Sequence, residues 1–490
     1  MADNEFRIES KSPANDDLLF WSIAGHEALA RASTYELTVL STNAFIDPRD
    51  VLGHAFDVVI EFADAHGDRH ERHCHGHAVR FTRGRQLGRY FRYQIQLRSW
   101  FWLLTKRVNS RILQEKPVLE IFESVLDDSP IKSVEKHTVD NVGGIHPMRR
   151  YCVQFQESDY DYLSRLMETE GIYYWFDAHD APGTMHLSDN SVIAHERLGA
   201  DAKLRFAPSS SSEARFNEIS EWIDARRLDS GKYASCDTDY KAIRQPKSID
   251  VFAAESHELA DLEVFEYPGG YFTGEEVDAV AKVHLEEFSG RRERHWGFTR
   301  WPDVAVGRSF DFEGDRDALR DGEYVIGSCV FVVSHPGYEG TEEADEPQPV
   351  GAVLHAAVRD DAVNADMMSA FVEQLERNPA LRTGLRGTSA FLITALPLAE
   401  SFRPPRLTPR VTMPGPQSAI VCGPAGEELH VDEGRVMVHF HWDRYNDGDG
   451  KATCWIRVSQ PWAGKGWGGY FMPRIGQEVI VEFMNGDPDR

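Results

Sequence analysis

Histidines are concentrated in one short stretch of the sequence. Residues 70–77 read His-Glu-Arg-His-Cys-His-Gly-His. In an extended strand, His73, His75 and His77 would point to the same side, where imidazoles can bind a metal ion. Alternate side chains lie about 7 Å apart along a strand, which is too far for one ion without a bend. We therefore expect no metal site here, and interpret the stretch as a sheet edge whose imidazoles face solvent or polar partners.

The segment that begins at Asp443 has the aspartate and glycine content of a calcium-binding loop. Such a loop needs an oxygen ligand at its third position and a bidentate glutamate at its twelfth. Those positions hold Tyr445 and Cys454. The stretch Asn-Asp-Gly-Asp-Gly at residues 446–450 instead predicts a hairpin turn.

Motifs of enzymes are absent from the sequence, which contains no HExxH, no G-x-S-x-G and no P-loop. With 79 acidic residues, no carboxylate pair stands out as a general acid and base. We predict no catalytic residue, no cofactor, no cofactor-binding residue and no metal ligand. We expect that these 490 residues are not an enzyme.

The composition excludes several classes of partner and location. A net charge of −26 repels phosphate backbones and anionic lipid, so we expect no nucleic-acid partner. No apolar run approaches the roughly eighteen residues of a membrane span. The first six residues lack the basic and apolar regions of a secretory signal, so export would need another route. Six cysteines without a CxxC pair are typical of reduced thiols in a protein folded in the cytoplasm.

Hydrophobic periodicity predicts mainly strands with a few helical insertions. Residues 57–62 and 89–97 have the composition of strands. A short helix is expected from Pro117, which suits a first helical position. Its expected apolar face consists of Val118, Ile121, Phe122, Val125 and Leu126.

Two further helices are expected from their capping residues. Ser158 and Gly171 are the residue types of a helix cap and a helix exit, and a strand over residues 172–176 should follow. A third helix is expected from Thr273, capped by Glu276. Its inward face would hold Val277, Ala281, Leu285 and Phe288.

A proline-rich stretch at residues 402–410 predicts an extended linker and a domain boundary near residue 400. Before it, residues 341–347 form an acidic stretch that we interpret as a solvated loop. After it, strand periodicity dominates, with about five short strands expected in some eighty residues. That is the size of a small closed barrel such as an OB-fold.

Three segments resemble the VgrG family of type VI secretion spike proteins. The first joins Leu-Arg-Ser-Trp-Phe-Trp-Leu-Leu at residues 97–104 to residues 110–116. The second runs from Tyr-Cys-Val-Gln-Phe-Gln-Glu-Ser-Asp-Tyr at 151–160 to Glu-Gly-Ile-Tyr-Tyr-Trp-Phe at 170–176. The third extends from Gly-Pro-Gln at 415–417 through Gly-Arg-Val-Met-Val-His-Phe-His-Trp-Asp at 434–443 to Gly-Asp-Pro-Asp-Arg at 486–490.

The resemblance implies a mainly β fold with helical insertions. Residues 1–400 would be a phage-tail-hub-like domain of two related β-barrels, and residues 401–490 an OB-fold neck. A triple-stranded β-helix needle would follow beyond residue 490, where the sequence is cut off. Trp442, Trp455, Trp462 and Phe471 are candidates for packing between necks, although a core position inside one barrel is the favoured interpretation for each.

The family implies a mechanical function. A homotrimer would assemble in the bacterial cytoplasm, cap the hexameric tube of Hcp, and be secreted with its effectors when a sheath contracts. Expected partners are a PAAR-type tip protein, baseplate proteins, and effectors or adaptor proteins. Two alternatives stay open: a hub of a phage or phage-derived particle, and a spike that carries a toxin domain beyond residue 490.

Overall fold

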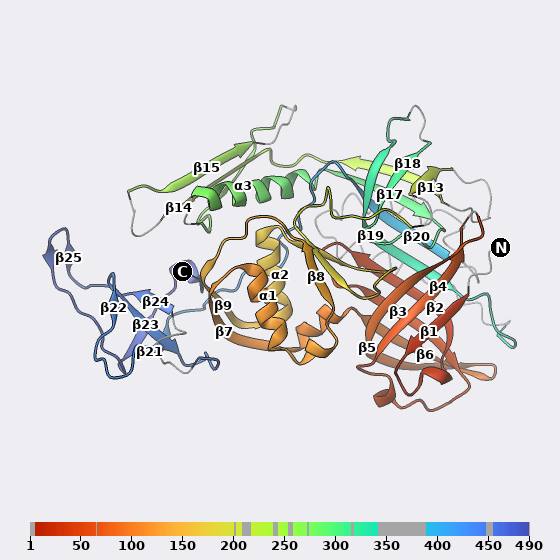
Figure 1. The fold of residues 1–490 in the computed structure, drawn as a ribbon, viewed down its shortest axis with the longest axis horizontal. Coiled ribbons are helices and arrows are strands. Elements are labelled where there is room, and N and C mark those ends of the chain that lie inside the picture. Colours follow the sequence, from red (N-terminus) through yellow and green to blue (C-terminus); the bar gives the residue numbers. More distant parts are fainter. Residues whose placement is uncertain are drawn as a thin grey trace. The chain divides into compact units, whose positions relative to one another are not determined.

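The structure is a computed structural model in which the chain forms two compact units (Figure 1). Unit 1 comprises residues 1–102, 134–144 and 171–405, and unit 2 comprises residues 103–133, 145–170 and 406–490. Unit 2 is thus assembled from three separate stretches of the chain. The structure describes residues 5–64, 66–199, 202–207, 217–238, 244–252, 258–271, 274–314, 318–341, 389–446 and 454–489.

The main sheet of unit 1 has twelve strands, and the N-terminal hundred residues supply its first half. All neighbours within this half pair antiparallel. β1 lies at the edge, and its Phe6 stacks on Phe20 of β2 with ring centroids 4.6 Å apart. In order across the sheet, the strands are β1 (Phe6–Ser10), β4 (Ala55–Ala63), β5 (Arg69–Leu87), β6 (Tyr90–Arg98), β3 (Thr34–Ser41) and β2 (Leu19–Ala28).

The second half of this sheet is a closed barrel of six strands. β19 and β20 pair directly, which closes the ring and removes its exposed edges. β19 also pairs with β2, so one strand serves both halves. In order around the barrel, the strands are β19 (Gly322–Ser334), β18 (Ser309–Glu313), β12 (Lys203–Phe206), β13 (Glu218–Arg226), β17 (Glu293–Thr299) and β20 (Ser389–Pro397).

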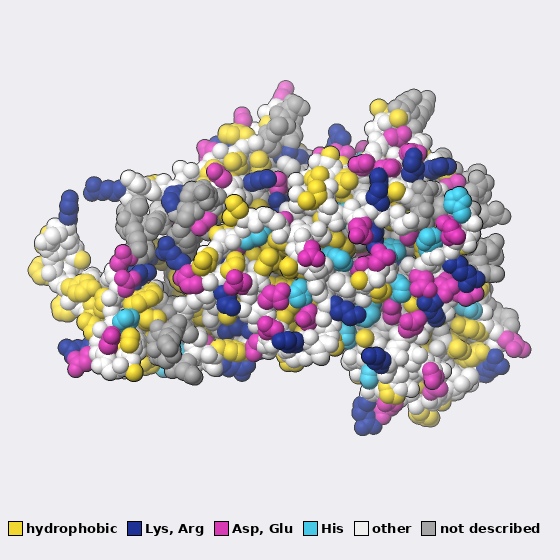
Figure 2. Space-filling model, viewed as in Figure 1, with side chains coloured by type: hydrophobic (Ala, Val, Ile, Leu, Met, Phe, Trp, Pro, Cys, Tyr) yellow, Lys and Arg dark blue, Asp and Glu magenta, His cyan; other side chains and the backbone are white. Residues whose placement is uncertain are grey.

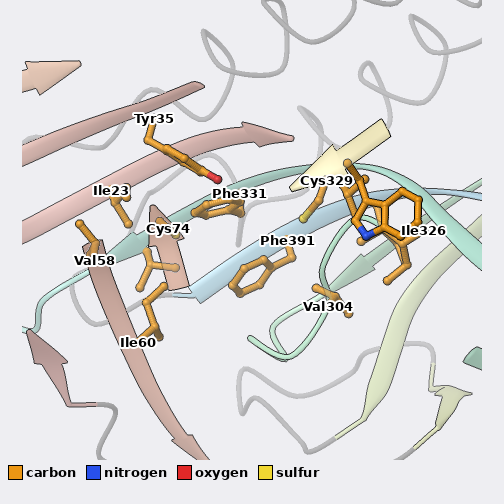
Figure 3. Packing of buried hydrophobic residues seen from close by; sticks show 14 of the residues in the cluster. Ile23, Tyr35, Val58, Ile60, Cys74, Val304, Ile326, Cys329, Phe331 and Phe391 are labelled. Atoms are coloured by element: carbon orange, nitrogen blue, oxygen red, sulfur yellow. The ribbon is translucent and has the colours of Figure 1, made fainter. Parts of the chain in front are cut away.

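One hydrophobic core runs through both halves (Figure 3). Figure 3 shows Phe331 of β19 and Phe391 of β20 side by side, and their rings stack at a centroid distance of 5.4 Å. Cys74 of β5 is buried in the same cluster. The shared core makes the two halves one folding unit, because removing either half would expose apolar surface of the other.

A charged side chain, Arg72, is buried completely in this core. It donates a hydrogen bond to the Glu27 carboxylate at 2.8 Å and another to the carbonyl of Val304. The guanidinium lies over the rings of Phe331 and Phe391, 4.7 and 5.3 Å from their centroids. Because both charges are removed from water, each is compensated mainly by the other.

Two smaller sheets complete unit 1. The first contains β8 (His137–Asn141), β10 (Tyr173–Phe176) and β11 (Met185–Ser188). The second contains β14 (Lys232–Asp237), β15 (Lys247–Phe252) and β16 (Glu263–Glu266). Helix α3 (Gly274–Ser289) lies along the second sheet in Figure 1, and Tyr233 of β14 packs against its Ala281 and Phe288.

Unit 2 combines a helical layer with a five-stranded barrel sheet. The helices α1 (Val118–Asp127) and α2 (Asp159–Glu170) lie beside the ribbon of β7 (Val108–Lys116) and β9 (Arg149–Ser158) in Figure 1. The five-stranded sheet contains β22 (Val431–Asp432), β23 (Arg435–Phe440), β21 (Gln417–Cys422), β27 (Glu478–Val481) and β24 (Cys454–Arg457). A short hairpin of β25 (Ala463–Gly464) and β26 (Trp467–Gly468) stands apart.

The structure confirms the helices expected near residues 117 and 158. The five residues predicted for the apolar face of α1 are all buried. The Ser158 hydroxyl accepts a hydrogen bond from the amide of Asp161 at 3.0 Å, and Gly171 ends α2 with a φ of +71°. In α3, Val277, Ala281 and Phe288 are buried and Leu285 is half-buried. Thr273, the expected cap of α3, lies outside the described residues, as does the acidic stretch at 342–347.

The expected fold class is confirmed: the chain is mainly β with helical insertions, and a five-stranded barrel follows the hub. The division into domains 1–400 and 401–490 stays a prediction. The compact units change near that point, between Pro405 and Arg406, but unit 2 also includes residues 103–133 and 145–170. Among the described helices, none is both long and apolar enough to cross a membrane.

We predict that Glu27→Ala destabilises unit 1 by about 3–5 kcal/mol, because it leaves Arg72 charged and unpaired in the core. It also removes the acceptor of the Tyr35 hydroxyl, which donates to Glu27 at 2.9 Å. Urea unfolding measures the change. Glu36→Ala is the matched control: Glu36 pairs with Arg80 at 2.7 Å on the surface, where a pair contributes about 0–1 kcal/mol. Equal losses in the two variants would contradict a special role for the buried pair.

Candidate functional site

The histidines at 73, 75 and 77 lie on one side of β5, as strand alternation predicted. The structure agrees with the interpretation of this stretch as a sheet edge: residues 69–77 of β5 pair with β4 on one side, whereas the pairing with β6 on the other side begins only at His77. His73 Nδ1 lies 2.8 Å from Asp57 Oδ2, and the rings of His75 and His77 meet edge to face at 6.1 Å. In the part of the chain that the structure describes, no three His, Cys, Asp or Glu side chains are arranged to hold a metal ion.

Burial lowers the pKa of all three histidines, and a carboxylate partner offsets this effect only at His73. Burial lowers the pKa of His77 to about 4, helped by the charges of His75 and Lys136. Burial also lowers the pKa of His75. For His73, burial acts in the same direction, but the hydrogen bond and charge of Asp57 outweigh it and raise the pKa. At neutral pH, His75 and His77 are therefore neutral packing groups.

The loop that begins at Asp443 is held by its own carboxylate. Asp443 is buried and accepts hydrogen bonds from the backbone amide of Tyr445, at 3.2 Å, and from the side chain of Asn446. Burial raises the pKa of Asp443. Residues 447–450, most of the predicted turn, lie outside the described residues.

Four aromatic side chains of the C-terminal barrel are exposed to solvent. Trp462, Trp467, Tyr470 and Phe471 are 64%, 60%, 65% and 65% exposed, and we call them the aromatic hairpin. The two tryptophan rings meet edge to face at 5.8 Å. Figure 2 shows hydrophobic side chains gathered over this barrel, beside the labels β22 to β25 of Figure 1.

Hydrogen bonds hold the aromatic hairpin in place. β25 pairs with β26, and the amide of Gly469 donates to the carbonyl of Trp462 at 2.8 Å. The Gln460 side chain donates to the carbonyl of Phe471 at 3.1 Å and accepts from its amide at 2.8 Å. Exposure of several neighbouring aromatic rings to water is unfavourable, and such a patch is typical of a site that another surface covers.

The candidates for packing between necks divide into two groups. Trp442 stacks on Phe440 at 4.9 Å inside the barrel, and Trp455 is half-buried beside His430 at 5.1 Å. For Trp462 and Phe471, the favoured interpretation as core residues is wrong, because both are exposed. Their hydrophobicity predicted that these side chains would be buried, but no described residue of this chain covers them.

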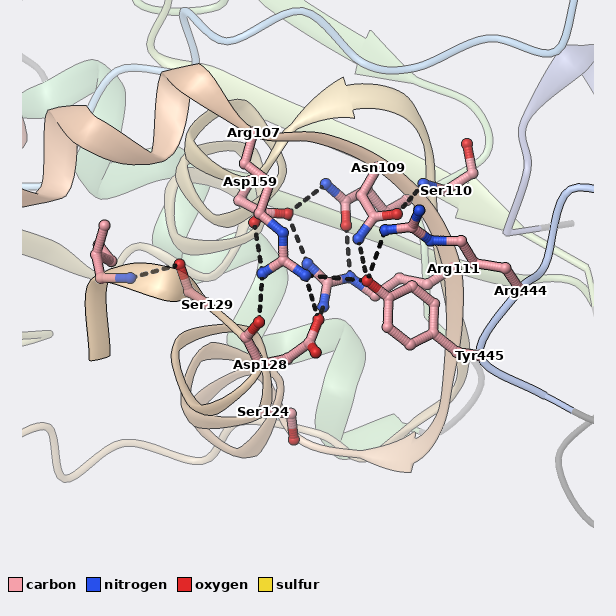
Figure 4. Close-up of polar contacts among 12 residues, drawn as sticks. Arg107, Asn109, Ser110, Arg111, Ser124, Asp128, Ser129, Asp159, Arg444 and Tyr445 are labelled. Atoms are coloured by element: carbon pink, nitrogen blue, oxygen red, sulfur yellow. Dashed lines mark hydrogen bonds and ion pairs between the residues drawn. The ribbon is translucent and has the colours of Figure 1, made fainter. Parts of the chain in front are cut away.

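A network of charged side chains joins the three stretches of unit 2 (Figure 4). Arg111 of β7 pairs with Asp159 of α2 at 2.5 Å and with Asp128, after α1, at 3.2 Å. Arg107 pairs with the same two carboxylates. Tyr445, from the loop after β23, accepts a hydrogen bond from Arg107 at 3.0 Å, and its ring lies 5.5 Å from the Arg111 guanidinium.

Two arginines and two aspartates thus neutralise one another around a tyrosine hydroxyl. Asp159 is fully buried and Arg111 nearly so. Burial raises the pKa of Asp128, but the hydrogen bonds from Arg107 and Tyr445 outweigh it, so the pKa lies below its ordinary value. Asp128 therefore stays charged at neutral pH, and the ion pairs of the network fix α1 and α2 against the loop that carries Tyr445.

The sequence profile of the phage tail baseplate hub family matches residues 26–337. The chain belongs to this phage tail baseplate hub family. A second profile, the type VI secretion system/phage-baseplate injector OB domain, matches residues 427–490, which contain most of the five-stranded sheet and the aromatic hairpin.

Known relatives cover nearly all of this chain. It is 32% identical over 485 residues to the type VI secretion system spike protein VgrG1b of Pseudomonas aeruginosa, a match that covers 99% of this chain and 59% of VgrG1b. The chain therefore spans about three fifths of that relative. It is 28% identical over 428 residues to the actin cross-linking toxin VgrG1 of Vibrio cholerae, covering 85% of this chain and 34% of the toxin.

A solved structure has the same fold. The E. coli protein c3393, described as a component of the type VI secretion system with structural similarity to the T4 tail proteins gp27 and gp5, superposes with a TM-score of 0.62. The match covers 99% of this chain and 98% of that chain at 17% identity. The resemblance to VgrG spike proteins and to phage tail hubs is confirmed.

We predict that Tyr445→Phe destabilises unit 2 by about 1 kcal/mol, because donors of the charged network lose their shared acceptor. Arg107 and Asn109 both donate to the Tyr445 hydroxyl. Thermal unfolding followed by circular dichroism measures the loss. Tyr470→Phe, at an exposed tyrosine of the same unit, should be neutral. A neutral Tyr445→Phe would show that the hydroxyl contributes nothing to the network.

We predict that His77→Leu flattens the pH dependence of stability between about pH 6.5 and 4. The pKa of His77 is about 4 in the folded protein, so in this window the imidazole binds a proton only in the unfolded chain. Acidification therefore favours the unfolded state and lowers stability. The variant should lose a slope of up to about 1.4 kcal/mol per pH unit. Urea unfolding at several pH values measures this. An unchanged slope would place the titration elsewhere.

Proposed function

We propose that this chain is the hub and neck of a type VI secretion spike, which acts mechanically as a homotrimer. Homology to a VgrG spike protein over 99% of the chain supports this assignment. The main structural support for a trimer is the aromatic hairpin, whose four rings are exposed on a single chain. Copies related by symmetry would cover the same rings on every chain at once.

The energetics favour such an assembly. Burying one aromatic side chain contributes about 1.5–3 kcal/mol, and three symmetric copies repeat the gain. Aromatic side chains are also the residues most enriched at the centres of protein interfaces. The rigid support of the hairpin reduces the entropy lost on association, because the rings are already positioned.

The hub would cap the hexameric Hcp tube in the cytoplasm, and sheath contraction would secrete the assembly with its effectors. A PAAR-type tip, baseplate proteins and adaptors are the partners that this function requires. We assign no catalytic role to these residues; the charged network around Tyr445, for example, consists of side chains that pair with one another.

A toxin-bearing spike is the second candidate. The Vibrio cholerae relative is named as an actin cross-linking toxin, and this chain matches only 34% of it. In that case the catalytic activity would reside in another part of the protein, and the present residues would still form the hub and neck. A phage-derived hub shares the same fold, and it differs in the machine that drives it.

We predict that the chain of 490 residues has the mass of three copies in solution, and that Trp462→Ser with Phe471→Ser shifts it to one copy. Light scattering after size-exclusion chromatography measures the mass. The matched control is Phe252→Ser with Phe265→Ser, two aromatic side chains that are 59% and 60% exposed in unit 1. A single-chain mass for the unmodified protein would contradict the trimer.

The secretion function is tested in the native bacterium. We predict that the protein appears in the culture supernatant only when the contractile sheath is functional. Release that is independent of the sheath, or that follows cell lysis, would favour the phage-derived hub instead.

A further inference from the structure

The hairpin of β5 and β6 concentrates positive charge on an acidic protein. Residues 80–92 contain five arginines and no acidic residue, whereas the whole chain has a net charge of −26. Arg80, Arg83, Arg85 and Arg89 are exposed. Glu36 pairs with Arg80 at 2.7 Å, and the charge of Glu339 reaches Arg89. Without these five arginines, the remaining residues have a net charge more negative than −26, and the tip of the hairpin is locally positive.

Aromatic rings orient the arginines at this tip. The guanidinium of Arg83 lies 4.6 Å from the ring centroid of Phe45 and 5.6 Å from that of Phe91. Arg89 lies over the ring of Tyr90 at 5.0 Å and donates to its hydroxyl at 2.7 Å. A guanidinium that stacks on a ring keeps its N–H edge available for a carboxylate. Stacking therefore positions the donors without neutralising their charge.

Phe45 adds an apolar contact to the charged one. Its ring is 80% exposed, although Arg83 covers one face. The amide of Phe45 donates to the Asn43 side chain at 2.9 Å, which fixes the turn that presents the ring. Aromatic and arginine side chains are among the residue types enriched at protein interfaces.

The fold holds the tip of the hairpin in place. Tyr90 is buried against Trp21 and Leu40, and its ring lies 6.1 Å from that of Tyr338. Gly88 has a φ of +56°, and a Cβ atom there would lie 2.6 Å from the carbonyl oxygen of Gly340. The turn between β5 and β6 therefore rests directly on the backbone near residue 340, so that its arginines do not move freely.

We propose that this tip, formed by Phe45, Arg80, Arg83, Arg85 and Arg89, is a docking surface for an acidic peptide segment of another protein. Carboxylates would accept from the oriented guanidinium edges, and an apolar side chain of the segment would cover the free face of Phe45. The site goes beyond the proposed function, since neither the trimer nor sheath-driven secretion requires it.

The charge distribution favours a short acidic segment over the other polyanions. A nucleic acid or an anionic membrane extends well past a tip of this size, and the surrounding acidic surface would repel the part beyond it. A short segment stays within reach of the arginines. It also brings the apolar side chain that the exposed Phe45 ring requires, which a phosphate backbone lacks.

The test measures binding of a fluorescein-labelled peptide of glutamate and leucine to the whole chain by fluorescence anisotropy. The site variant is Arg83→Glu with Arg89→Glu. The matched control, Arg205→Glu with Arg410→Glu, makes the same change in net charge at exposed arginines elsewhere. A third variant, Phe45→Ser, removes the apolar contact without changing charge. Thermal unfolding of each variant establishes that it is folded.

We expect the site variant to lose at least about tenfold in affinity, which corresponds to about 1.4 kcal/mol, whereas the control stays within about twofold. Phe45→Ser should weaken binding of this peptide more than binding of a poly-glutamate peptide. Three results would overturn the proposal: no binding by the unmodified chain, equal losses in site and control variants, or tighter binding of an oligonucleotide or of anionic vesicles than of the peptide.

Discussion

The buried pair of Arg72 and Glu27 is the constraint on which the hub unit depends. A guanidinium without exposure to water must be compensated in place, and its partners come from β2 and from the segment before β18. Phe331 and Phe391, from the two strands that close the barrel, cover the guanidinium. These partners must meet before the charge is compensated, so the pair links the N-terminal half-sheet to the closed barrel. An apolar residue at 72 could fill the same volume, but it would not select one arrangement of these strands.

Local signals in the sequence predicted local structure well. The cap of α2, its glycine exit and the apolar face of α1 each depend on residues within a few positions of one another. The small barrel was predicted because strand periodicity needs only short segments. The partner of Arg72 was not predictable in this way, because Val304 lies 232 residues away along the chain. For the same reason, nothing in the sequence indicated that residues 103–133 and 145–170 would pack with the C-terminal barrel in one unit.

The candidate site shows a different limit of sequence reasoning. Trp462 and Phe471 are hydrophobic, and hydrophobicity indicates that a side chain is to be covered without identifying the chain that covers it. The network around Asp159 was missed for a related reason. Arg107, Arg111 and Asp128 have the residue types of an ordinary charged surface, and only the fold brings Tyr445 between them. The two features thus differ in one respect: the charges of the network pair with one another, whereas the rings of the aromatic hairpin are exposed to solvent.

The arginines of this chain also divide into those that pair with a carboxylate of the same chain and those that are exposed to solvent. Arg72, Arg111 and Arg165 are buried, and each meets a carboxylate of its own chain within 3 Å. Arg83 and Arg89 are exposed and lie on aromatic rings instead, and Arg89 also donates to the Tyr90 hydroxyl. In a protein with 79 acidic and 53 basic residues, carboxylates are abundant, yet Arg83 and Arg89 contact aromatic rings. The net charge of −26 repels any acidic surface that approaches the protein. This repulsion is weakest at the hairpin of β5 and β6, where five arginines occur without an acidic residue between them.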